Sequence, residues 1–103
     1  MPAVPAVREA ELQAAIVETA RLLGWFVYHT HDSRGSEAGF PDLVLVRGRR
    51  LLFAELKVGR REVTLEQRVW LAALEEAAVE TETYVWREAD WIDGSIERVI
   101  RAT

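Results

Sequence analysis

Two short apolar runs, 42–47 and 50–56, are separated only by a Gly-Arg dipeptide. Apolar runs of this length around a two-residue loop that begins with glycine are typical of a β-hairpin with a type II′ turn. Such a loop pairs the last residue of the first run with the first residue of the second, and the same register sets Asp42 opposite Glu55. Directly opposed side chains have Cβ atoms about 5 Å apart. The pattern therefore predicts a close pair of carboxylates.

Three charged residues interrupt this apolar hairpin: Asp42 at the start of the first strand, and Glu55 and Lys57 at the end of the second. Because side chains alternate along a strand, all three belong to the same face. The other positions are apolar on both faces, with Val44, Val46, Leu51 and Phe53 on one and Leu43, Leu45, Leu52, Ala54 and Leu56 on the other. A strand pair of this kind predicts the centre of a sheet that helices or loops cover on both faces.

The segment 9–23 predicts an amphipathic helix that stops at Gly24. Its apolar stripe consists of Leu12, Ala15, Ile16, Thr19, Ala20 and Leu23. At 100° per residue, Glu9 lies about 60° from Leu12 and borders the apolar face, whereas Glu11 points toward water. We therefore expect Glu9 to be the acid at the rim of the core, with Glu11 as the alternative.

A basic loop at 58–63 precedes a second predicted helix at 65–79. Thr64 is a suitable N-cap, and Gln67 stands three residues later, at the spacing of a capping box. The inward side chains of this helix are predicted to be Val69, Trp70, Leu71, Ala73, Leu74 and Ala77.

The remaining segments predict two more strands and a last helix. Aromatic and β-branched residues at 25–30 favour a strand, which a polar loop at 31–38 follows. A short strand at 83–86 comes before 90–100, which contains a turn at Asp93-Gly94 and a short helix. The element order is αβββαβα, and the fold class is α/β: a sandwich of about four strands with flanking helices.

With 103 residues, half of them apolar, the chain suits one small domain. We predict a flexible N-terminal arm at 1–8, which holds two prolines, and a single domain at 9–103. No apolar run is long enough to span a membrane, and the N-terminus does not resemble a secretory signal. There is no cysteine, and we therefore expect a cytoplasmic protein.

The net charge of −4 argues against a general nucleic-acid binder. The cations are nevertheless concentrated in the window 47–61, where Glu55 is the only acid. Lys57 is the only lysine of the chain, and its place beside Glu55 is notable in a composition that favours arginine. The window holds Arg47, Arg49, Arg50, Lys57, Arg60 and Arg61.

Two opposed carboxylates raise one another's pKa unless a positive group lies between them. Lys57 is one candidate, in a purely structural salt bridge, and a divalent cation is another. Asp42, Glu55 and the backbone carbonyl of Leu56 offer the hard oxygen ligands that suit Mg²⁺, and Glu9 is a further ligand through water. Such a site fits hydrolysis of a phosphodiester, with Lys57 orienting or deprotonating the attacking water or stabilising the charge that develops.

Four short segments of the sequence, in this order and spacing, resemble the VRR-Nuc domain family of the PD-(D/E)XK nuclease superfamily. The matching strings are EAELQ, GFPD, ELK and TLEQRVWL, which span about 9–86. The resemblance is to stand-alone domains of phages and bacteria that are similar to Holliday-junction resolvases. It implies the core order αβββαβ, with a mixed sheet flanked by helices.

The same resemblance implies a DNA endonuclease that depends on Mg²⁺ or Mn²⁺ and acts as a homodimer on branched DNA such as four-way junctions. It makes Asp42, Glu55 and Lys57 the catalytic trio and Glu9 the helix-borne acid. It places Gln67 beside the site. Two alternatives remain: a nuclease with a restriction-type or single-strand substrate, and a DNA-binding or assembly module that retains the fold without activity.

Further polar residues are candidates for contact with DNA. We expect Ser33, Arg34, Arg60 and Arg61 to lie nearest the predicted site and to contact phosphates. The turn arginines stand at the far end of the hairpin, about 3.3 Å per residue away, where a solvated face is expected. His29 and His31 share a face and are either a transition-metal pair, a polar edge near the site, or part of a solvated loop.

Overall fold

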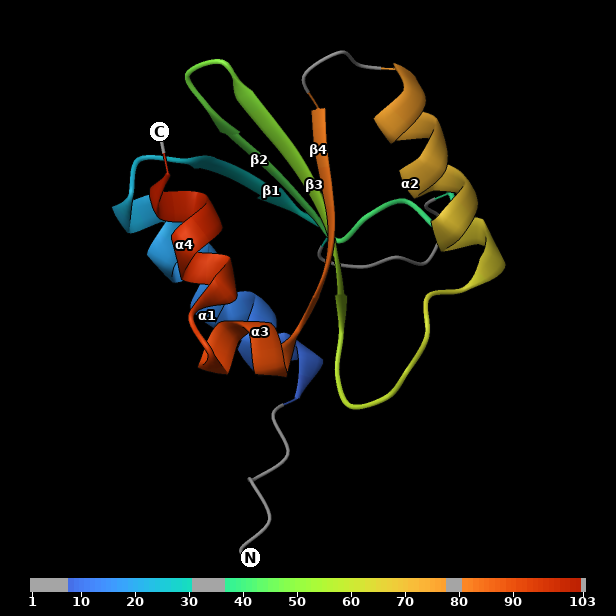
Figure 1. Cartoon of the computed structure of the whole chain (residues 1–103), viewed down its shortest axis with the longest axis horizontal. Helices are drawn as coiled ribbons and strands as arrows, with labels where there is room; N and C mark the ends of the chain where they lie inside the picture. Colours follow the sequence, from blue (N-terminus) through green and yellow to red (C-terminus); the bar gives the residue numbers. More distant parts are fainter. Residues whose placement is uncertain (1–7, 31–36, 78–80, 103) are drawn as a thin grey trace, which may run out of the picture.

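The computed structural model describes residues 8–30, 37–77 and 81–102. The element order confirms the predicted α/β class, with the core order αβββαβ followed by two short helices (Figure 1). The elements are α1 (Glu9–Leu22), β1 (Phe26–His29), β2 (Leu43–Arg47), β3 (Arg50–Lys57), α2 (Leu65–Ala77), β4 (Thr81–Arg87), α3 (Glu88–Ile92) and α4 (Ser95–Arg101).

The four strands form one mixed sheet in the order β1-β2-β3-β4. β1 and β2, and β2 and β3, are antiparallel, whereas β3 and β4 are parallel. The hairpin has the predicted register, with Arg47 opposite Arg50 and Leu43 opposite Ala54. Gly48 has a φ of 59°, and Arg49 has no positive φ, as a type II′ turn requires.

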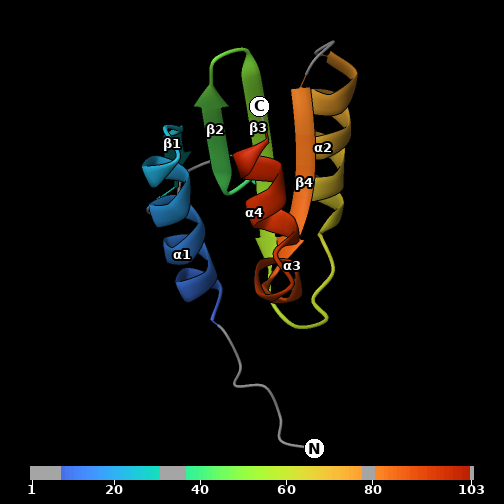
Figure 2. The ribbon, with the colours of Figure 1, turned by 60° about the vertical axis from the view of Figure 1, so that its left-hand side comes forward.

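The hydrophobic core lies between one face of the sheet and α1, α3 and α4, which gather on that side (Figures 1 and 2). The strands contribute every second side chain to it, as the alternation of a half-buried sheet requires. Its buried members include Leu12, Ile16, Trp25, Leu43, Leu45, Leu52, Leu56, Trp86, Ile96 and Ile100.

The described residues cover the opposite face of the sheet only in part, which corrects the expectation that both faces are buried. α2 lies beside β4 at one edge of this face, and the views place it away from β1 (Figures 1 and 2). On β1 and β2, Phe26, Tyr28 and Val46 are 79%, 59% and 38% exposed. One helix cannot cover a four-stranded sheet, because a helix with its side chains is about 10–12 Å wide and strands are about 4.8 Å apart.

The predicted inward stripe of α2 is therefore wrong in part. None of its residues is buried, and Val69 is 61% exposed. Trp70 is partly buried and packs edge-on against Phe40, with 5.1 Å between the ring centroids, while Phe40 in turn packs against Phe53 at 6.1 Å. This aromatic row holds the beginning of β2 against α2.

The chain after β4 differs from the prediction because it contains an extra helix, α3. Asp90 accepts a hydrogen bond from the backbone N–H of Arg87 at 3.0 Å, which caps this helix. The turn at Asp93-Gly94 is confirmed, and Gly94 adopts the left-handed conformation with a φ of 86°. Among the described residues, no helix is long and apolar enough to cross a membrane.

Candidate active site

Asp42 lies just before β2 and reaches across to the end of β3. Its Oδ2 atom accepts a hydrogen bond from the backbone N–H of Leu56 at 2.9 Å. Within a strand, the N–H and C=O of one residue point toward the same neighbouring strand. The Leu56 carbonyl therefore faces the same edge as the Asp42 carboxylate.

The residue that leaves this carbonyl available is Pro41. Continuing the hairpin register by two residues places Pro41 opposite Leu56. Proline has no N–H, and so Pro41 cannot donate the hydrogen bond that would otherwise extend the ladder. The Asp42 side chain takes the place of the ladder acceptor for Leu56 N–H, and the Leu56 carbonyl has no ladder donor in Pro41.

Glu55 and Lys57 lie at the end of β3 and are almost completely buried, with 1% and 5% exposure. The Lys57 Nζ atom is 3.8 Å from Glu55 Oε2. The other carboxylate oxygen, Oε1 of Glu55, is buried and has no hydrogen-bond partner among the described residues. A buried acceptor without a donor is unfavourable, and a cation or a donor beside it would remove this cost.

The pKa of Glu55 is raised to about 8. Burial disfavours its charged form and is the largest cause, and the Asp42 carboxylate adds to it by accepting a hydrogen bond from the protonated form and by repelling the ionised one. Lys57 and a hydrogen bond from the Asp42 backbone act in the opposite direction and are outweighed. The predicted mutual repulsion of the two carboxylates is therefore present, and Lys57 alone does not neutralise it.

Glu9 begins α1 and approaches the same site from another element. Burial raises the pKa of Glu9 and the charge of Asp42 raises it further, whereas Lys57 and Arg61 lower it. Glu11 is exposed. Of the two candidate helix acids, Glu9 is thus the one within electrostatic reach of Asp42.

Gln67 lies at the start of α2 and forms the predicted capping box with Thr64. Its Oε1 accepts from the Thr64 N–H at 2.8 Å, and its own N–H donates to Thr64 Oγ1 at 3.2 Å. Gln67 and Asp42 also line one pocket of about 330 Å³, together with Thr30, Glu37, Ala38, Gly39 and Phe40. The pocket opens the Asp42 side of the site toward the partly covered face of the sheet.

Gly39 lines this pocket and lies directly against the backbone of α2. It has a φ of 94°, and a Cβ atom added to it would lie 2.6 Å from the backbone carbonyl of Glu66. The chain before Asp42 therefore approaches the first turn of α2 more closely than any residue with a side chain allows.

The donor set fits a hard divalent cation. Two carboxylates and a backbone carbonyl meet at one edge, and the unpartnered Glu55 Oε1 is an acceptor that a cation would satisfy. Within 8–30, 37–77 and 81–102, no three His, Asp or Glu side chains come close enough to hold one ion together.

The basic loop after β3 is held close to the site by β4 and α3. Arg87 Nη1 donates to the Arg61 carbonyl at 2.6 Å, and Glu88 accepts from the Gly59 N–H at 2.8 Å. Arg60 and Arg61 are both exposed. The Arg87 contact could not be predicted from the sequence, because its partners lie 26 and 28 residues away along the chain.

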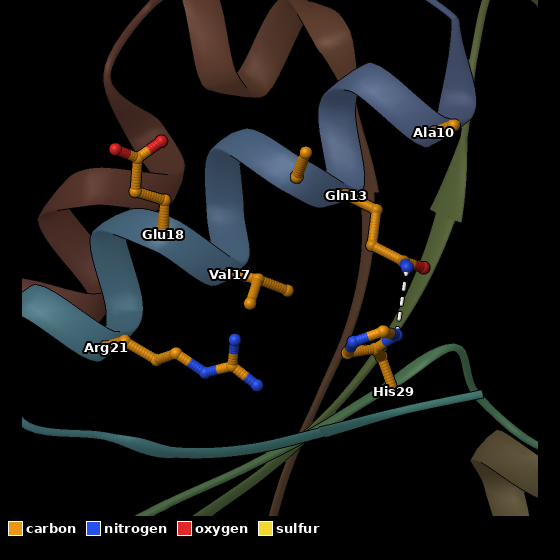
Figure 3. Close-up of a pocket in the computed structure, with 7 residues that line it drawn as sticks. Ala10, Gln13, Val17, Glu18, Arg21 and His29 are labelled. Atoms are coloured by element: carbon orange, nitrogen blue, oxygen red, sulfur yellow. Dashed lines mark hydrogen bonds between the residues drawn. The ribbon is translucent and has the colours of Figure 1, made fainter. Parts of the chain in front are cut away.

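His29 faces α1 rather than the open side of the sheet. Its Nδ1 is 3.3 Å from Nε2 of Gln13, beside a pocket of about 320 Å³ that Arg21 and Glu18 also line (Figure 3). The other predicted residues of this region, His31, Ser33 and Arg34, lie outside the described residues.

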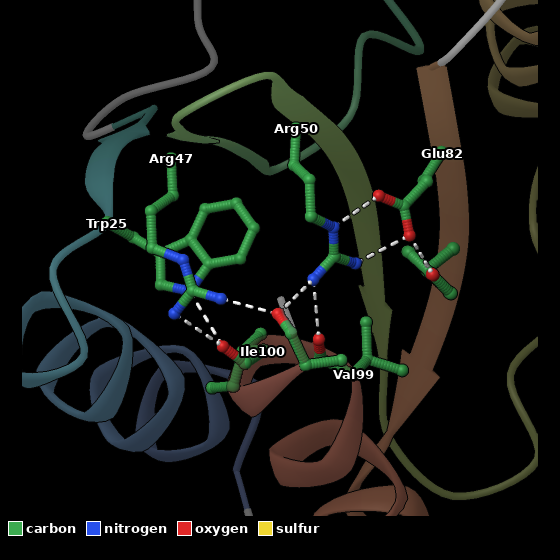
Figure 4. Close-up of polar contacts among 8 residues, drawn as sticks. Trp25, Arg47, Arg50, Glu82, Val99 and Ile100 are labelled. Carbon is green, nitrogen blue, oxygen red and sulfur yellow. Dashed lines mark hydrogen bonds and ion pairs between the residues drawn. The ribbon is translucent and has the colours of Figure 1, made fainter.

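Arg47 and Arg50 are not solvated surface cations, which corrects the prediction for the hairpin end (Figure 4). Arg47 donates to the carbonyls of Ile100 at 3.0 Å, Leu23 at 3.2 Å, and Ala102. Its guanidinium lies 4.7 Å from the centroid of the Trp25 ring. The guanidinium therefore binds the carbonyl end of α4, where a helix favours positive charge.

Arg50 supports the same helix end and also binds β4 (Figure 4). It donates to the Val99 carbonyl at 2.9 Å and to both carboxylate oxygens of Glu82 at 2.8 and 2.7 Å. This forked hydrogen bond holds the pKa of Glu82 below its usual value. Both arginines are thus structural, and of the turn group only Arg49 is exposed.

A mixed four-stranded sheet with two carboxylates and a lysine at the ends of its central strands has the architecture of a PD-(D/E)XK nuclease core. The family model of the VRR-NUC domain matches residues 3–85. The chain therefore belongs to the VRR-NUC domain family, which confirms the resemblance and makes it a nuclease-type, DNA-cleaving protein.

One solved structure, of a VRR_NUC domain protein, shares the fold. It superposes with a TM-score of 0.65 at 20% sequence identity, over 91% of this chain and 86% of that one. At this identity the likeness shows the fold alone. None of the curated proteins compared with the chain matches it.

Proposed function

We propose that the chain is a metal-dependent DNA endonuclease whose active site is formed by Asp42, Glu55 and Lys57. The observation that carries this proposal is the buried Glu55 carboxylate, whose Oε1 has no partner among the described residues and whose pKa is raised to about 8. A pair of acidic groups held together in this unfavourable way is typical of a functional site.

The residues have separate roles in the proposed reaction. Asp42, Glu55 and the Leu56 carbonyl hold Mg²⁺ or Mn²⁺, which when bound polarises a phosphate oxygen and lowers the pKa of a coordinated water. Lys57, fixed beside Glu55, orients the attacking water and stabilises the negative charge that develops at phosphorus. Glu9 adds a carboxylate that accepts from waters at the site.

We further propose that Arg60 and Arg61 contact the DNA backbone, since both are exposed on the loop that Arg87 fixes beside β3. Gln67 shapes the site through its place in the pocket with Asp42. Ser33 and Arg34 remain proposed contacts from the sequence.

The proposed substrate is branched DNA, cleaved by a homodimer. A small domain gains stability from association, and a two-fold dimer suits a substrate with two-fold character. The family to which the chain belongs is the basis for this choice.

A panel of labelled four-way junction, flap, linear duplex and single-stranded DNA with Mg²⁺ or Mn²⁺ tests this function. The proposal expects cleavage of the junction in preference to the linear duplex, and Lys57→Ala removes that cleavage. Equal cleavage of all four substrates excludes junction selectivity, and an equally active Lys57→Ala protein excludes the proposed site.

A further inference from the structure

The outward face of β1 carries two exposed aromatic side chains, Phe26 and Tyr28. They are 79% and 59% exposed, although the intervening Val27 packs against the core. β1 is an edge strand, and α2, the helix on this side of the sheet, lies beside β4 at the other edge (Figures 1 and 2). Large aromatic rings exposed this far at the surface of a small domain require an explanation.

The two rings form a row that leads to the candidate active site. Positions two apart on a strand are about 6.6–6.8 Å from one another. Tyr28 is opposite Val44, which makes Asp42 its diagonal neighbour at about 7–8 Å. Thr30, which directly follows β1 and is two residues beyond Tyr28, lines the same pocket as Asp42 and Gln67. Phe26, Tyr28 and the pocket thus follow one another along β1 and its end.

The charges along this row permit the approach of a phosphate backbone. The outward positions of β1 and β2 between the hairpin end and Asp42 are Phe26, Tyr28, Val44 and Val46, none of which is acidic. Aromatic rings on an open strand bind unpaired bases by stacking, which contributes about 1–3 kcal/mol per base and requires no particular sequence. Paired bases are stacked inside a duplex and cannot use such rings.

We propose that Phe26 and Tyr28 form a stacking site for unpaired nucleotides adjacent to the phosphate that is cleaved. The inference rests on the proposed nuclease function and deepens it, because it makes a single-stranded segment next to the active site part of the substrate. The segment runs along β1 and enters the pocket between Thr30, Asp42 and Gln67.

The test measures binding without cleavage, by fluorescence anisotropy in EDTA with a labelled single-stranded oligonucleotide and a blunt duplex of equal length. Phe26→Ser and Tyr28→Ser each weaken single-strand binding by at least about fivefold, the equivalent of one lost stacking contact, and leave duplex binding unchanged. Ile92→Ser is the matched control, since Ile92 is 60% exposed but lies on α3, on the other side of the sheet.

Tyr28→Trp provides a second readout that loss of folding cannot imitate. Its ring retains the stacking surface, so the variant binds the single strand as the natural protein does, and the new indole fluorescence is quenched by the single strand and not by the duplex. Because binding is measured in EDTA, where no metal is available, the result does not depend on cleavage. It therefore supports the stacking site even if the protein cleaves no DNA.

Two results overturn the proposal. One is single-strand affinity that is equal in Phe26→Ser, Tyr28→Ser and Ile92→Ser. The other is a dimer by sedimentation that becomes monomeric in Phe26→Ser and Tyr28→Ser while single-strand affinity is retained, which assigns the face to a second copy of the chain.

Discussion

Asp42 Oδ2 accepts a hydrogen bond from the Leu56 N–H at 2.9 Å and thereby joins the start of β2 to the end of β3. The bond brings the Asp42 carboxylate to the edge that the Leu56 carbonyl faces, one residue from the buried Glu55. The three oxygen groups proposed as metal ligands therefore lie where the ladder between β2 and β3 ends. This is a site built by the interruption of a sheet, with Pro41 ensuring that the ladder does not continue.

Metal binding is expected to depend on pH through Glu55. Its carboxyl has a pKa of about 8 and must lose its proton before it can bind a cation. Between about pH 6 and 8 the affinity for Mn²⁺ should rise up to about tenfold per pH unit, with release of up to one proton, and level off above pH 8. Isothermal titration calorimetry in buffers of different ionisation enthalpy measures both quantities. An affinity that is constant from pH 6 to 9 contradicts the assignment of Glu55 as a ligand.

Without metal, the same carboxyl should make the protein less stable as the pH rises. Between its unfolded pKa of 4.5 and its folded pKa of about 8, the folded state keeps a proton that the unfolded state loses, so the free energy of unfolding falls as the pH increases through this window. Glu55→Gln removes this effect and should stabilise the metal-free protein by about 1–3 kcal/mol at pH 8, at 1.36 kcal/mol per pKa unit and with allowance for the buried amide.

Urea unfolding at pH 5 and pH 8 measures this difference. Glu97→Gln is the control, since Glu97 is a partly exposed acid on α4 whose ion pair with Arg101 lies at the surface, and its loss should change the free energy by no more than about 0.5 kcal/mol. A Glu55→Gln protein that is less stable than the natural one at pH 8 disagrees with the raised pKa.

Gly39→Ala should destabilise the protein by about 2–5 kcal/mol, the sum of left-handed backbone strain and a steric clash. The clash arises because the new Cβ would lie 2.6 Å from the Glu66 carbonyl. Gly48→Ala is the matched control: its φ is also positive, but no atom lies within 4 Å of the added Cβ, so about 1–2 kcal/mol is expected. Thermal unfolding compares the two, and equal losses would show that the contact with α2 contributes nothing.

Arg50→Met should lower the free energy of unfolding by about 1–3 kcal/mol, the usual range for hydrogen bonds to charged groups. The bonds to Glu82 and to the end of α4 are both lost. The pKa of Glu82 is lowered in the folded protein. The stability contributed by the Arg50–Glu82 pair is therefore fully present above pH 4.5 and is lost as the pH falls through the folded pKa of Glu82. Urea unfolding measures the free energies of Arg50→Met and of the control Arg49→Met, which changes an exposed arginine of the same turn. Equal stability of the two variants refutes a structural role for Arg50.

The hairpin and its carboxylate pair could be predicted because the information is local. A two-residue loop fixes the register, and the register decides which side chains are opposite one another. The same reasoning selected Glu9 over Glu11, since a helical wheel shows which acid borders the core. The roles of these residues remain proposals, although their positions follow from the chain itself.

The burial of α2 could not be predicted in the same way. An apolar stripe shows which side of a helix is suited to packing, but it does not show how much of the sheet remains for that helix to cover. Three helices occupy one face here and one helix occupies part of the other (Figure 2). The exposure of Val69 and of Phe26 and Tyr28 follows from this division.

The structural arginines escaped prediction for a different reason. Arg47 binds carbonyls that lie 53 and 24 residues away, at the ends of two helices. Backbone carbonyls carry no sequence signal, and long-range partners of a turn cannot be identified from one chain. By contrast, the short α3 had a local signal in Asp90, three residues after Arg87, at the spacing of a helix cap.

The most direct test of the central claim is DNA cleavage with Mn²⁺ by Lys57→Met, which removes the charge beside Glu55 and keeps the length of the side chain. Arg101→Met, which removes an exposed charge from α4, is the control. The account predicts that Lys57→Met binds Mn²⁺ and DNA but cleaves at least about 100-fold more slowly, as expected when a group that stabilises the charge developing in the transition state is lost. A Lys57→Met protein that cleaves as fast as Arg101→Met would contradict it.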